Sequence, residues 1–512
     1  MKVFLRVDSS LSIGSGHIIR CINIATMLRK MGAECIFITK NHKGNIISKI
    51  RQADFLFEVM SVLEEPEYYI SNEKEWLNGR QSDDAVQFSS LLSQYSQKPD
   101  IIIVDHYSLD SEWEIIVKQN FPQARLVVID DLCNRKHHCD LLIDQTYLRH
   151  KHEYAELILP ETKVLTGTKF ALVNTDFYKF RNESIIRKKN LKRPLKLMIT
   201  MGGVDANNIT GKVLQYLEEI NYKNIQKITV IIGSKCPHRT EICELTRNSK
   251  YNIQVVIDIS NMAELMLEHD FAIGALGGTT WERCVMGLPA VNIAIARNQH
   301  TVAQNLSKSG AIVLYSDKFK KSEFSNALDN LMASYYQQSN LARIICDGHG
   351  LYRIVQEIIP NYAKDGINVA LRPATIDDIS FVYKLQCEPH TRRFARNPNI
   401  PTFENHSVWM RCKLLEEKSL FYIIEHEGAC GVLRLDAIEH KTAQYEISVF
   451  LTSRCIGKGI ASAAIRRAMM LNNNSIIMAT VLLENYASHQ LFKNLGYKQI
   501  SQDKYISRKN DE

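Results

Sequence analysis

Val3-Phe4-Leu5-Arg6-Val7, followed closely by Ile13-Gly14-Ser15-Gly16-His17, is the stretch that decides how this chain begins to fold. The apolar run predicts a strand, and the spacing of apolar residues after His17 predicts a helix that stops near Gly32. Glycines at a strand-to-helix turn let the phosphates or sugar of a ligand approach the backbone, and a histidine there can supply acid–base chemistry. The alternative interpretation is a tight turn with a surface histidine.

Further strands of the same kind follow. The apolar runs 35–38, 101–104 and 126–129 are typical of parallel strands that are buried on both faces. Asp105 and Asp130-Asp131 come directly after two of these runs, and ligands usually bind at the carboxyl ends of strands in an open α/β sheet. A helix cap or a turn is the alternative for each carboxylate.

A second α/β series begins at Leu197-Met198-Ile199-Thr200 and contains another glycine-rich helix start, Gly274 to Glu282. Backbone amides and threonine hydroxyls at a helix N-terminus can bind phosphate oxygens, whereas a glutamate suits a sugar hydroxyl. Favourable placement against the helix dipole is the alternative for the glutamate. The predicted binding residues of this half are Gly202, Gly203, Gly277, Gly278, Thr279, Thr280, Glu282, Asn298 and Gln299.

The chain changes character from about residue 369, where short strands and turns replace the α/β pattern. The segment Arg454-Cys455-Ile456-Gly457-Lys458-Gly459-Ile460 opens a predicted helix, so its amides and the helix dipole favour a bound diphosphate. A glycine-rich helix start without a ligand is the alternative.

Composition excludes several classes of protein. A chain of 512 residues with 45% hydrophobic residues is typical of a globular protein of about three domains. Its net charge of +7 is mild, no apolar run reaches the roughly 20 residues that cross a bilayer, and the 12 cysteines are dispersed. We therefore expect a cytoplasmic protein with reduced thiols, no nucleic-acid partner and no membrane insertion.

Two further clusters have ordinary interpretations. Cys133, His137, His138 and Cys139 lack the regular spacing of zinc ligands, so a turn is favoured and no metal is predicted. The basic stretch 187–194 has no interleaved aromatic residue and predicts a surface connection.

Taken together, the motifs of residues 1–350 resemble the two-domain GT-B glycosyltransferases, and specifically the nucleotide-sugar hydrolases of pseudaminic acid biosynthesis. The resemblance implies that water releases UDP from UDP-2,4-diacetamido-2,4,6-trideoxy-β-L-altropyranose, with inversion at the anomeric carbon. The motifs that carry it are Arg6-Val7-Asp8, Gly14-Ser15-Gly16-His17, Gly202-Gly203-Val204-Asp205, and Gly277 to Glu282 with Asn298-Gln299.

The resemblance also implies roles for single residues. His17 would orient or deprotonate the water, Asp8 and Asp131 could assist, and Arg6, Gly14 and Gly16 would lie on the sugar's side. Asn298 and Gln299 would hold the sugar, Gly278, Thr279 and Thr280 the diphosphate, and Glu282 the ribose.

The last region resembles the GNAT acetyltransferases, through Arg454 to Ile460 and the closing segments 484–488 and 491–497. The resemblance implies that residues 454–460 bind the diphosphate of acetyl-CoA and that Asn485 binds its pantetheine or a nearby backbone group. A strand amide near Val449 would hold the acetyl carbonyl, and Glu446 would act through water as base, or else be a surface residue. Phe492 stands where many relatives have the tyrosine that protonates the leaving thiolate, so Tyr486 is considered as its substitute.

We therefore predict an α/β chain with a GT-B-like pair of Rossmann-like domains at 1–160 and 161–355, a linker at 356–368 and a GNAT α+β domain at 369–512. The fusion would N-acetylate a UDP-4-amino-4,6-dideoxy sugar with acetyl-CoA and then hydrolyse the UDP-sugar, and it leaves room for contact with other sugar-biosynthesis enzymes. The alternatives are a GT-B glycosyltransferase of surface polysaccharide synthesis, a UDP-sugar sensor without turnover, and a hydrolase whose acetyltransferase has an unrelated acceptor.

Overall fold

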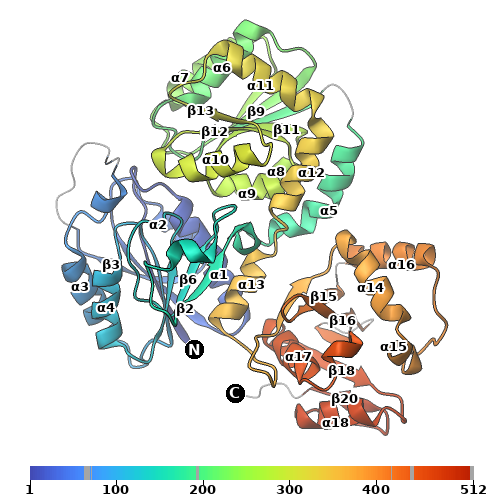
Figure 1. The fold of residues 1–512 in the computed structure, drawn as a ribbon. Coiled ribbons are helices and arrows are strands. Elements are labelled where there is room, and N and C mark those ends of the chain that lie inside the picture. The colour runs from blue at the N-terminus through green and yellow to red at the C-terminus, as the bar shows by residue number, and fades with distance from the viewer. Residues whose placement is uncertain (63–69, 71, 192–194, 417, 439–442, 508–512) are drawn as a thin grey trace. The chain divides into compact units, whose positions relative to one another are not determined.

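The computed structural model describes residues 1–62, 70, 72–191, 195–416, 418–438 and 443–507. The chain forms two compact units, Met1–Thr26 with Glu34–Leu351 and Met27–Ala33 with Tyr352–Glu512. The first unit contains two parallel sheets and the second a mixed sheet (Figure 1). Among the helices of the described ranges, none is both long enough and apolar enough to span a membrane.

The first sheet has the strand order β3-β2-β1-β4-β5-β6-β7, and all its strands are parallel. The switch from β1 to β4 places the carboxyl ends of these two strands side by side, where open α/β sheets bind ligands. The strands are β1 Lys2–Val7, β2 Glu34–Lys40, β3 Leu56–Met60, β4 Ile101–Asp105, β5 Arg125–Ile129, β6 Leu141–Asp144 and β7 Lys163–Thr166, and the helices are α1 Gly16–Lys30, α2 Ile47–Gln52, α3 Gln81–Ser93 and α4 Ser111–Asn120.

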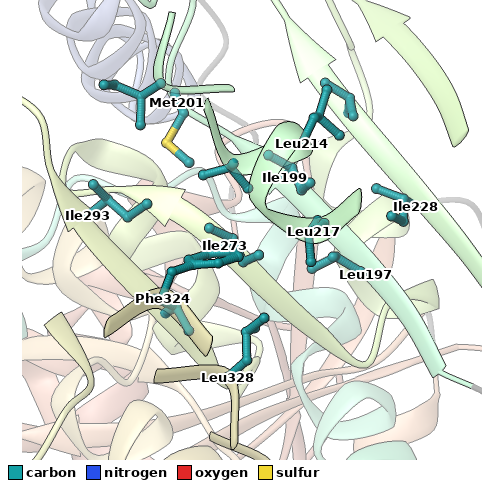
Figure 2. Packing of buried hydrophobic residues seen from close by; sticks show 14 of the residues in the cluster. Leu197, Ile199, Met201, Leu214, Leu217, Ile228, Ile273, Ile293, Phe324 and Leu328 are labelled. Carbon is teal, nitrogen blue, oxygen red and sulfur yellow. The ribbon is translucent and has the colours of Figure 1, made fainter. Parts of the chain in front are cut away.

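The second sheet repeats this plan with the order β10-β9-β8-β11-β12-β13. Its apolar strands pack against helices, and Leu197, Ile199 and Ile273 lie with Phe324 and Leu328 in one buried cluster (Figure 2). Each fully buried side chain of this kind contributes about 1.5–3 kcal/mol relative to exposure to water. The strands are β8 Leu195–Thr200, β9 Ile225–Ile232, β10 Ile253–Ile257, β11 Phe271–Ala275, β12 Ala290–Ala294 and β13 Val313–Tyr315, and the helices are α5 Asp176–Lys189, α6 Ile209–Ile220, α7 Arg239–Arg247, α8 Met262–Glu268, α9 Gly278–Val285, α10 His300–Lys308, α11 Lys321–Ala333 and α12 Tyr335–Ile345.

The mixed sheet of the second unit has the order β14-β15-β16-β17-β18-β20-β19. β17 and β18 are its parallel pair, but they pair only from Gln444 to Glu446 on β17. Beyond Glu446 the two strands part, because β17 continues along β16 while β18 continues along β20. The strands are β14 Ala370–Pro373, β15 Leu420–Glu425, β16 Ala429–Ala437, β17 Gln444–Leu451, β18 Ile476–Thr480, β19 Lys498–Gln499 and β20 Lys504–Ile506, and the helices are α13 Gly350–Ile358, α14 Ile379–Cys387, α15 Pro389–Arg393, α16 Phe403–Leu415, α17 Ile460–Leu471 and α18 Tyr486–Asn494.

This architecture confirms the predicted fold class of two Rossmann-like domains followed by an α+β domain. The division between the two units falls at Leu351 and Tyr352, so the residues predicted as a linker, 356–368, lie in the second unit. The buried side chain of Gln356 accepts from the amide of Leu371 at 2.6 Å and donates to its carbonyl at 2.7 Å. The exact domain limits remain predictions.

The basic stretch differs in part from the predicted surface connection. Residues 192–194 lie outside the described residues, but Arg187 to Lys189 form the last turn of α5. Lys188 is only 1% exposed and donates to Ser184 Oγ at 2.7 Å. Burial lowers the pKa of Lys188 to about 7, so the helix places this charge in an apolar interior.

Candidate active sites

The glycine-rich turn at the start of the chain leaves open space around its backbone. Gly14 has a positive φ of 78°, which glycine adopts without strain, and its amide donates to Ser10 O at 2.9 Å. A Cβ added at Gly14 or Gly16 would meet no atom within 4 Å. The turn therefore has room for a ligand directly before α1, as the sequence predicts.

His17, in the first turn of α1, is paired with the carboxylate at the end of β4. Its Nδ1 lies 2.6 Å from Asp105 Oδ1, and the histidine is 7% exposed. Burial alone would raise the pKa of Asp105, but the Arg20 guanidinium and His17 hold that pKa well below its usual range. An ionised carboxylate only accepts hydrogen bonds, so the proton of a neutral imidazole lies on Nδ1 and Nε2 is the free base.

Arg20 and Tyr107 complete the polar surroundings of His17. Arg20 donates to both oxygens of Asp105, at 2.6 Å each, and also contacts Asp131. The Tyr107 ring meets the His17 ring edge-on, with 4.6 Å between centroids, and its hydroxyl donates to Asp131 Oδ2 at 2.8 Å. Within the described part of the chain, Nε2 of His17 makes no hydrogen bond, so it remains available to a ligand or water.

The predicted residues Arg6 and Asp8 lie elsewhere in the interior. Both are fully buried, and Arg6 donates to Asp8 at 2.6 Å and 2.8 Å and to Asp84 at 2.7 Å and 3.0 Å. Burial would raise the pKa of Asp8, but Arg6 holds it well below its usual range. These charges are already satisfied by each other, so the geometry favours a structural role for both side chains rather than contact with a sugar.

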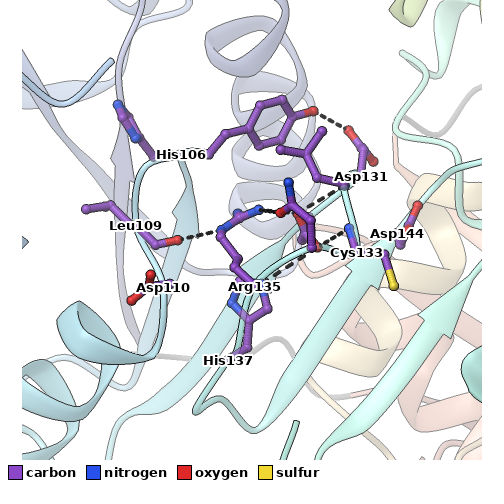
Figure 3. Close-up of polar contacts among 12 residues, drawn as sticks. His106, Leu109, Asp110, Asp131, Cys133, Arg135, His137 and Asp144 are labelled. Atoms are coloured by element: carbon purple, nitrogen blue, oxygen red, sulfur yellow. Dashed lines mark hydrogen bonds and ion pairs between the residues drawn. The ribbon is translucent and has the colours of Figure 1, made fainter. Parts of the chain in front are cut away.

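The carboxylate next to Asp131 supports the loop after β5. Asp130 accepts from Arg135 at 2.6 Å, and Arg135 also donates to Leu109 O at 2.9 Å (Figure 3). His137 lies between Asp130 and Glu114, with Nδ1 2.7 Å from Glu114 Oε1. Burial would lower the pKa of His137, but its hydrogen bonds to both carboxylates raise it to about 9. Among the described residues no group of three His, Cys, Asp or Glu could hold a metal ion.

In the second sheet domain, glycines again leave the backbone open after two strands. Gly202, with a φ of +85°, follows β8, and a Cβ there would meet no atom within 4 Å. A Cβ at Gly203 would lie 3.5 Å from Ser15 Oγ, which places the β8 loop beside the N-terminal turn within the first unit. The carboxylate of Asp205 accepts from the amides of Ile209 and Thr210 and so caps α6.

The start of α9 presents amides more than hydroxyls. Gly277 and Gly278 have open space where a Cβ would lie. Thr280 is buried, and its Oγ1 accepts from Gly277 N at 3.1 Å and donates to Ala275 O, so this hydroxyl is turned inward. Glu282 is half-buried, and burial raises its pKa to about 7 although Arg283 lowers it.

Arg283 is a buried cation directly behind this helix start. It is 1% exposed and donates only to neutral acceptors, among them Thr279 Oγ1 at 3.3 Å and Asn292 Oδ1 at 3.0 Å. Burial lowers its pKa to about 10, and among the described residues it forms no ion pair. A positive charge without a counter-ion strengthens the attraction of the α9 N-terminus for an anion.

The two polar residues predicted after β12, Asn298 and Gln299, differ in whether their side-chain oxygen has a partner. Gln299 Oε1 accepts from the amide of Ile295 at 2.8 Å, so its carbonyl group is used within the loop. Asn298 Oδ1 is buried, and within the described ranges it has no hydrogen-bond partner. An orphaned acceptor is costly unless a ligand or water satisfies it, which favours Asn298 over Gln299 as a ligand-binding amide.

In the second unit, the loop before α17 has the form that the sequence predicts. Gly457 and Gly459 both have positive φ, 81° and 80°, and Gly459 is the N-cap of α17. Ile456 is exposed and Cys455 is buried, so the loop projects its backbone while one side chain packs into the core. Arg454, Lys458 and Ile460 complete this loop.

The remaining predicted residues lie on β17 and at the start of α18. Glu446 is the last residue of β17 that pairs with β18, and its carboxylate accepts from Thr480 Oγ1 at 2.7 Å and pairs with Arg396. Val449 lies beyond this point on β17. Asn485 caps α18 by accepting from Ser488 N at 3.1 Å, and Tyr486 is exposed at the start of that helix.

Phe492 is a core residue of the second unit. It is buried and stacks on Tyr505, with 5.9 Å between ring centroids. A phenylalanine side chain has no proton to give to a thiolate, so position 492 departs from the tyrosine pattern as the sequence predicts.

Comparison with known families agrees with this division of the chain. Residues 196–357 match the glycosyltransferase family 28 C-terminal domain, and residues 368–498 match the acetyltransferase (GNAT) domain. The two matches follow one another along the chain and support a fusion of a GT-B-like part with a GNAT domain. This confirms the predicted GT-B-like part with a GNAT domain after it.

Relatives of the fusion differ in how much of it they cover. An uncharacterized protein of Methanocaldococcus jannaschii is 24% identical over 97% of both chains. The UDP-2,4-diacetamido-2,4,6-trideoxy-beta-L-altropyranose hydrolase of Campylobacter jejuni is 25% identical over 62% of this chain and 99% of its own length. The spore coat polysaccharide biosynthesis protein SpsG of Bacillus subtilis is 22% identical over 38% of this chain and 57% of its own.

The roles of several residues in these candidate sites could not be predicted from the sequence. Asp105 stands out in the sequence because it follows an apolar run, but its pairing with His17 depends on the adjacency of β1 and β4. Arg20 and Tyr107 carry no motif. Arg283 follows the predicted cradle directly, and a charged residue in the helix of a phosphate-binding turn is the signal that could have indicated it.

Proposed function

We propose that the first unit hydrolyses UDP-2,4-diacetamido-2,4,6-trideoxy-β-L-altropyranose to UDP and the free sugar, and that the second unit N-acetylates its UDP-4-amino-4,6-dideoxy precursor with acetyl-CoA. The observation that carries the hydrolase proposal is the His17–Asp105 pair, because it engages Nδ1 and leaves Nε2 available beside an open glycine turn. The Campylobacter jejuni relative is named for this hydrolysis, and its match covers 62% of this chain. Both reactions use cytoplasmic metabolites, so we place the fusion in the cytoplasm.

In the proposed hydrolysis, Nε2 of His17 takes a proton from water while the water oxygen attacks the anomeric carbon. The bond from that carbon to the diphosphate oxygen breaks, and UDP leaves with the bonding electron pair. Asp105 stabilises the imidazolium that forms. One direct displacement inverts the configuration at the anomeric carbon.

The leaving group needs charge stabilisation more than a strong acid. The open amides of Gly277 and Gly278 would bind the diphosphate, supported by the buried charge of Arg283 and the hydroxyl of Thr279. Glu282 would accept from the ribose. Asn298 would meet the sugar through its orphaned carbonyl oxygen, and Gln299 would position the loop.

In the proposed acetyl transfer, the sugar amine attacks the thioester carbonyl, the carbon–sulfur bond breaks, and CoA leaves as the thiolate. Glu446 would accept the amine proton through water, and the amide of a β17 residue near Val449 would stabilise the developing oxyanion. Residues 454–460 would bind the CoA diphosphate. Tyr486 remains the proposed source of the proton for the thiolate.

The direct test is incubation of the full chain with UDP-4-amino-4,6-dideoxy-AltNAc and acetyl-CoA in ¹⁸O-labelled water, followed by NMR and mass analysis. We expect free CoA, UDP and a diacetamido sugar with one ¹⁸O at the anomeric carbon. His17→Asn should stop at the acetylated UDP-sugar, and the exposed His152→Ala should behave as the unmodified chain. Label in UDP instead of the sugar would contradict attack at the anomeric carbon.

Glycosyl transfer is the second candidate, because residues 196–357 match a glycosyltransferase domain. In that case the UDP-sugar would be stable in water, and UDP release would require a hydroxyl acceptor. Measuring UDP release with and without added acceptor sugars separates the two reactions.

A further inference from the structure

The segment that joins the two sheet systems is attached to the helix of the proposed CoA site. Asn361 donates to Ala463 O of α17 at 2.6 Å and accepts from Arg466 Nε at 3.2 Å. Arg467, also on α17, donates to Ile359 O at 2.7 Å. These contacts lie within the second unit, so residues 359–361 move with α17 and do not form a free linker.

Residues 362–368 then form a tight turn that is hydrogen-bonded within itself and contacts the β15–β16 turn. Ala363 N donates to Ile367 O at 2.9 Å, and Tyr362 forms a bridge with Asn368. The carboxylate of Asp365 lies 3.0 Å from His426 Nε2 at the β15–β16 turn. The turn of residues 362–368 is therefore a defined element with a fixed orientation on its unit.

Lys364 at this tip lies directly on the predicted diphosphate loop. Its amide donates to Lys458 O at 3.0 Å. A Cβ added at Gly459 would lie 2.9 Å from Lys364 Cγ and 3.5 Å from its Cδ. The side chain of Lys364 thus crosses the N-cap of α17, and its ammonium group is only two bonds beyond Cδ.

The charges around this loop have no counter-ions of their own. Within the described ranges, neither Lys364 nor Lys458 nor Arg454 forms an ion pair with a carboxylate, and Lys364 is exposed. Lys364 thus lies at the positive end of α17, next to the open backbone at Gly457, in a loop that also carries Arg454 and Lys458. A diphosphate, which carries two negative charges, complements this arrangement.

We propose that Lys364, in the segment between the two enzymes, is a binding residue for the pyrophosphate of acetyl-CoA. The proposal rests on the proposed use of acetyl-CoA by the second unit. It makes the connecting segment one wall of the cofactor site, so bound CoA would contact the residues that lead into the acetyltransferase.

The test measures CoA binding to the full chain by calorimetry, independently of turnover. Lys364→Gln should weaken CoA and dephospho-CoA equally, by about 5- to 10-fold, and should leave pantetheine binding unchanged. Lys364→Arg should restore most of the affinity, and raising the salt concentration should reduce the difference between the variants. The exposed Lys418→Gln is the matched control and should bind like the unmodified chain.

Hydrogen exchange supplies a second readout, in which CoA should protect the amides of residues 364–368 in the unmodified chain. Unchanged CoA affinity in Lys364→Gln would overturn the proposal, and so would a loss that disappears with dephospho-CoA, since that would assign the charge to the 3′-phosphate. Failure of the unmodified chain to bind CoA would overturn the proposed function itself, which separates the two failures.

Discussion

His17 depends on a carboxylate 88 residues away in the chain. Asp105 on β4 accepts from Nδ1 at 2.6 Å, and Arg20, one turn further along α1, keeps that carboxylate ionised. The tautomer and the orientation of the ring are therefore set by a partner on another element. Tyr107 packs edge-on against the ring and restricts its rotation. The reactivity of the histidine is therefore a property of this group of side chains.

Asp105→Asn tests that dependence. The amide can donate to Nδ1 and so favours the tautomer with its proton on Nε2, which cannot act as base. We expect kcat for UDP-sugar hydrolysis to fall about 10²- to 10⁴-fold with KM changed much less.

The double variant His17→Asn with Asp105→Asn provides the control. It should be no slower than the slower single variant, because the two residues act as one unit. Additive losses in steady-state kinetics would mean that Asp105 acts independently of His17.

At the scale of single elements, the passage from β11 to α9 contains two glycines with different surroundings. A Cβ at Gly277 would enter open space, whereas a Cβ at Gly274 would lie 2.4 Å from Arg283 Nη1. Open space at the N-terminus of α9 is where a diphosphate would approach the amides.

Gly277→Ala should therefore leave the thermal unfolding temperature within about 1 °C and weaken UDP binding at least about 10-fold, as measured by calorimetry. Gly274→Ala is the matched comparison. It should lower the unfolding temperature, because the buried Arg283 must move away from its acceptors. Equal UDP affinity in Gly277→Ala and the unmodified chain would place the diphosphate elsewhere.

Helix α5 contains the buried amine of Lys188, which lowers the stability of the folded chain while it is charged. Its pKa in the folded chain, about 7, lies below the usual value of 10.5, so the unfolded chain binds more protons between these two pH values. The stability of the unmodified protein should therefore rise with pH over this window, by up to about 1.4 kcal/mol per pH unit.

Lys188→Met should remove this slope and stabilise the protein most near pH 7, as followed by calorimetric scans at pH 7.5 and 9.5. The neighbouring Lys189 is exposed, and Lys189→Met should keep the slope of the unmodified chain. A slope that persists in Lys188→Met would assign it to another group.

At the scale of the whole molecule, the fusion keeps its two sets of candidate residues in separate units. His17 and Asp105 lie in the first unit, and Glu446 and the loop 454–460 lie in the second. Two consecutive reactions on one chain require only that the intermediate reach the other unit, of the same molecule or of another.

An equimolar mixture of His17→Asn and Glu446→Gln chains should therefore convert the amino-sugar nucleotide to free diacetamido sugar, after a lag while the acetylated UDP-sugar accumulates. Product formation followed by NMR measures the lag, and each variant alone should give no free diacetamido sugar. No product from the mixture, with each variant retaining its remaining activity, would indicate that the intermediate is not released.

Local preferences explain which features could be predicted from the order of residues. Apolar runs, helix spacing and glycines at strand-to-helix turns depend on neighbours in the chain, and they predicted the two Rossmann-like domains and the open turns at Gly14, Gly277 and Gly457. The GNAT domain was expected from the resemblance of its motifs to that family. The type of each element and the places where a ligand can approach the backbone therefore follow from the order of residues along the chain.

The tertiary structure alone decided which polar groups are free. Strand order brings Asp105 to His17, whereas the same sheet buries Arg6 and Asp8 against Asp84. Charges are satisfied by whichever partners the fold brings within a few ångströms, and burial makes an unpaired group costly, so pairing depends on contacts between distant segments. For the same reason only the folded chain places Lys364 of the connecting segment on the loop before α17.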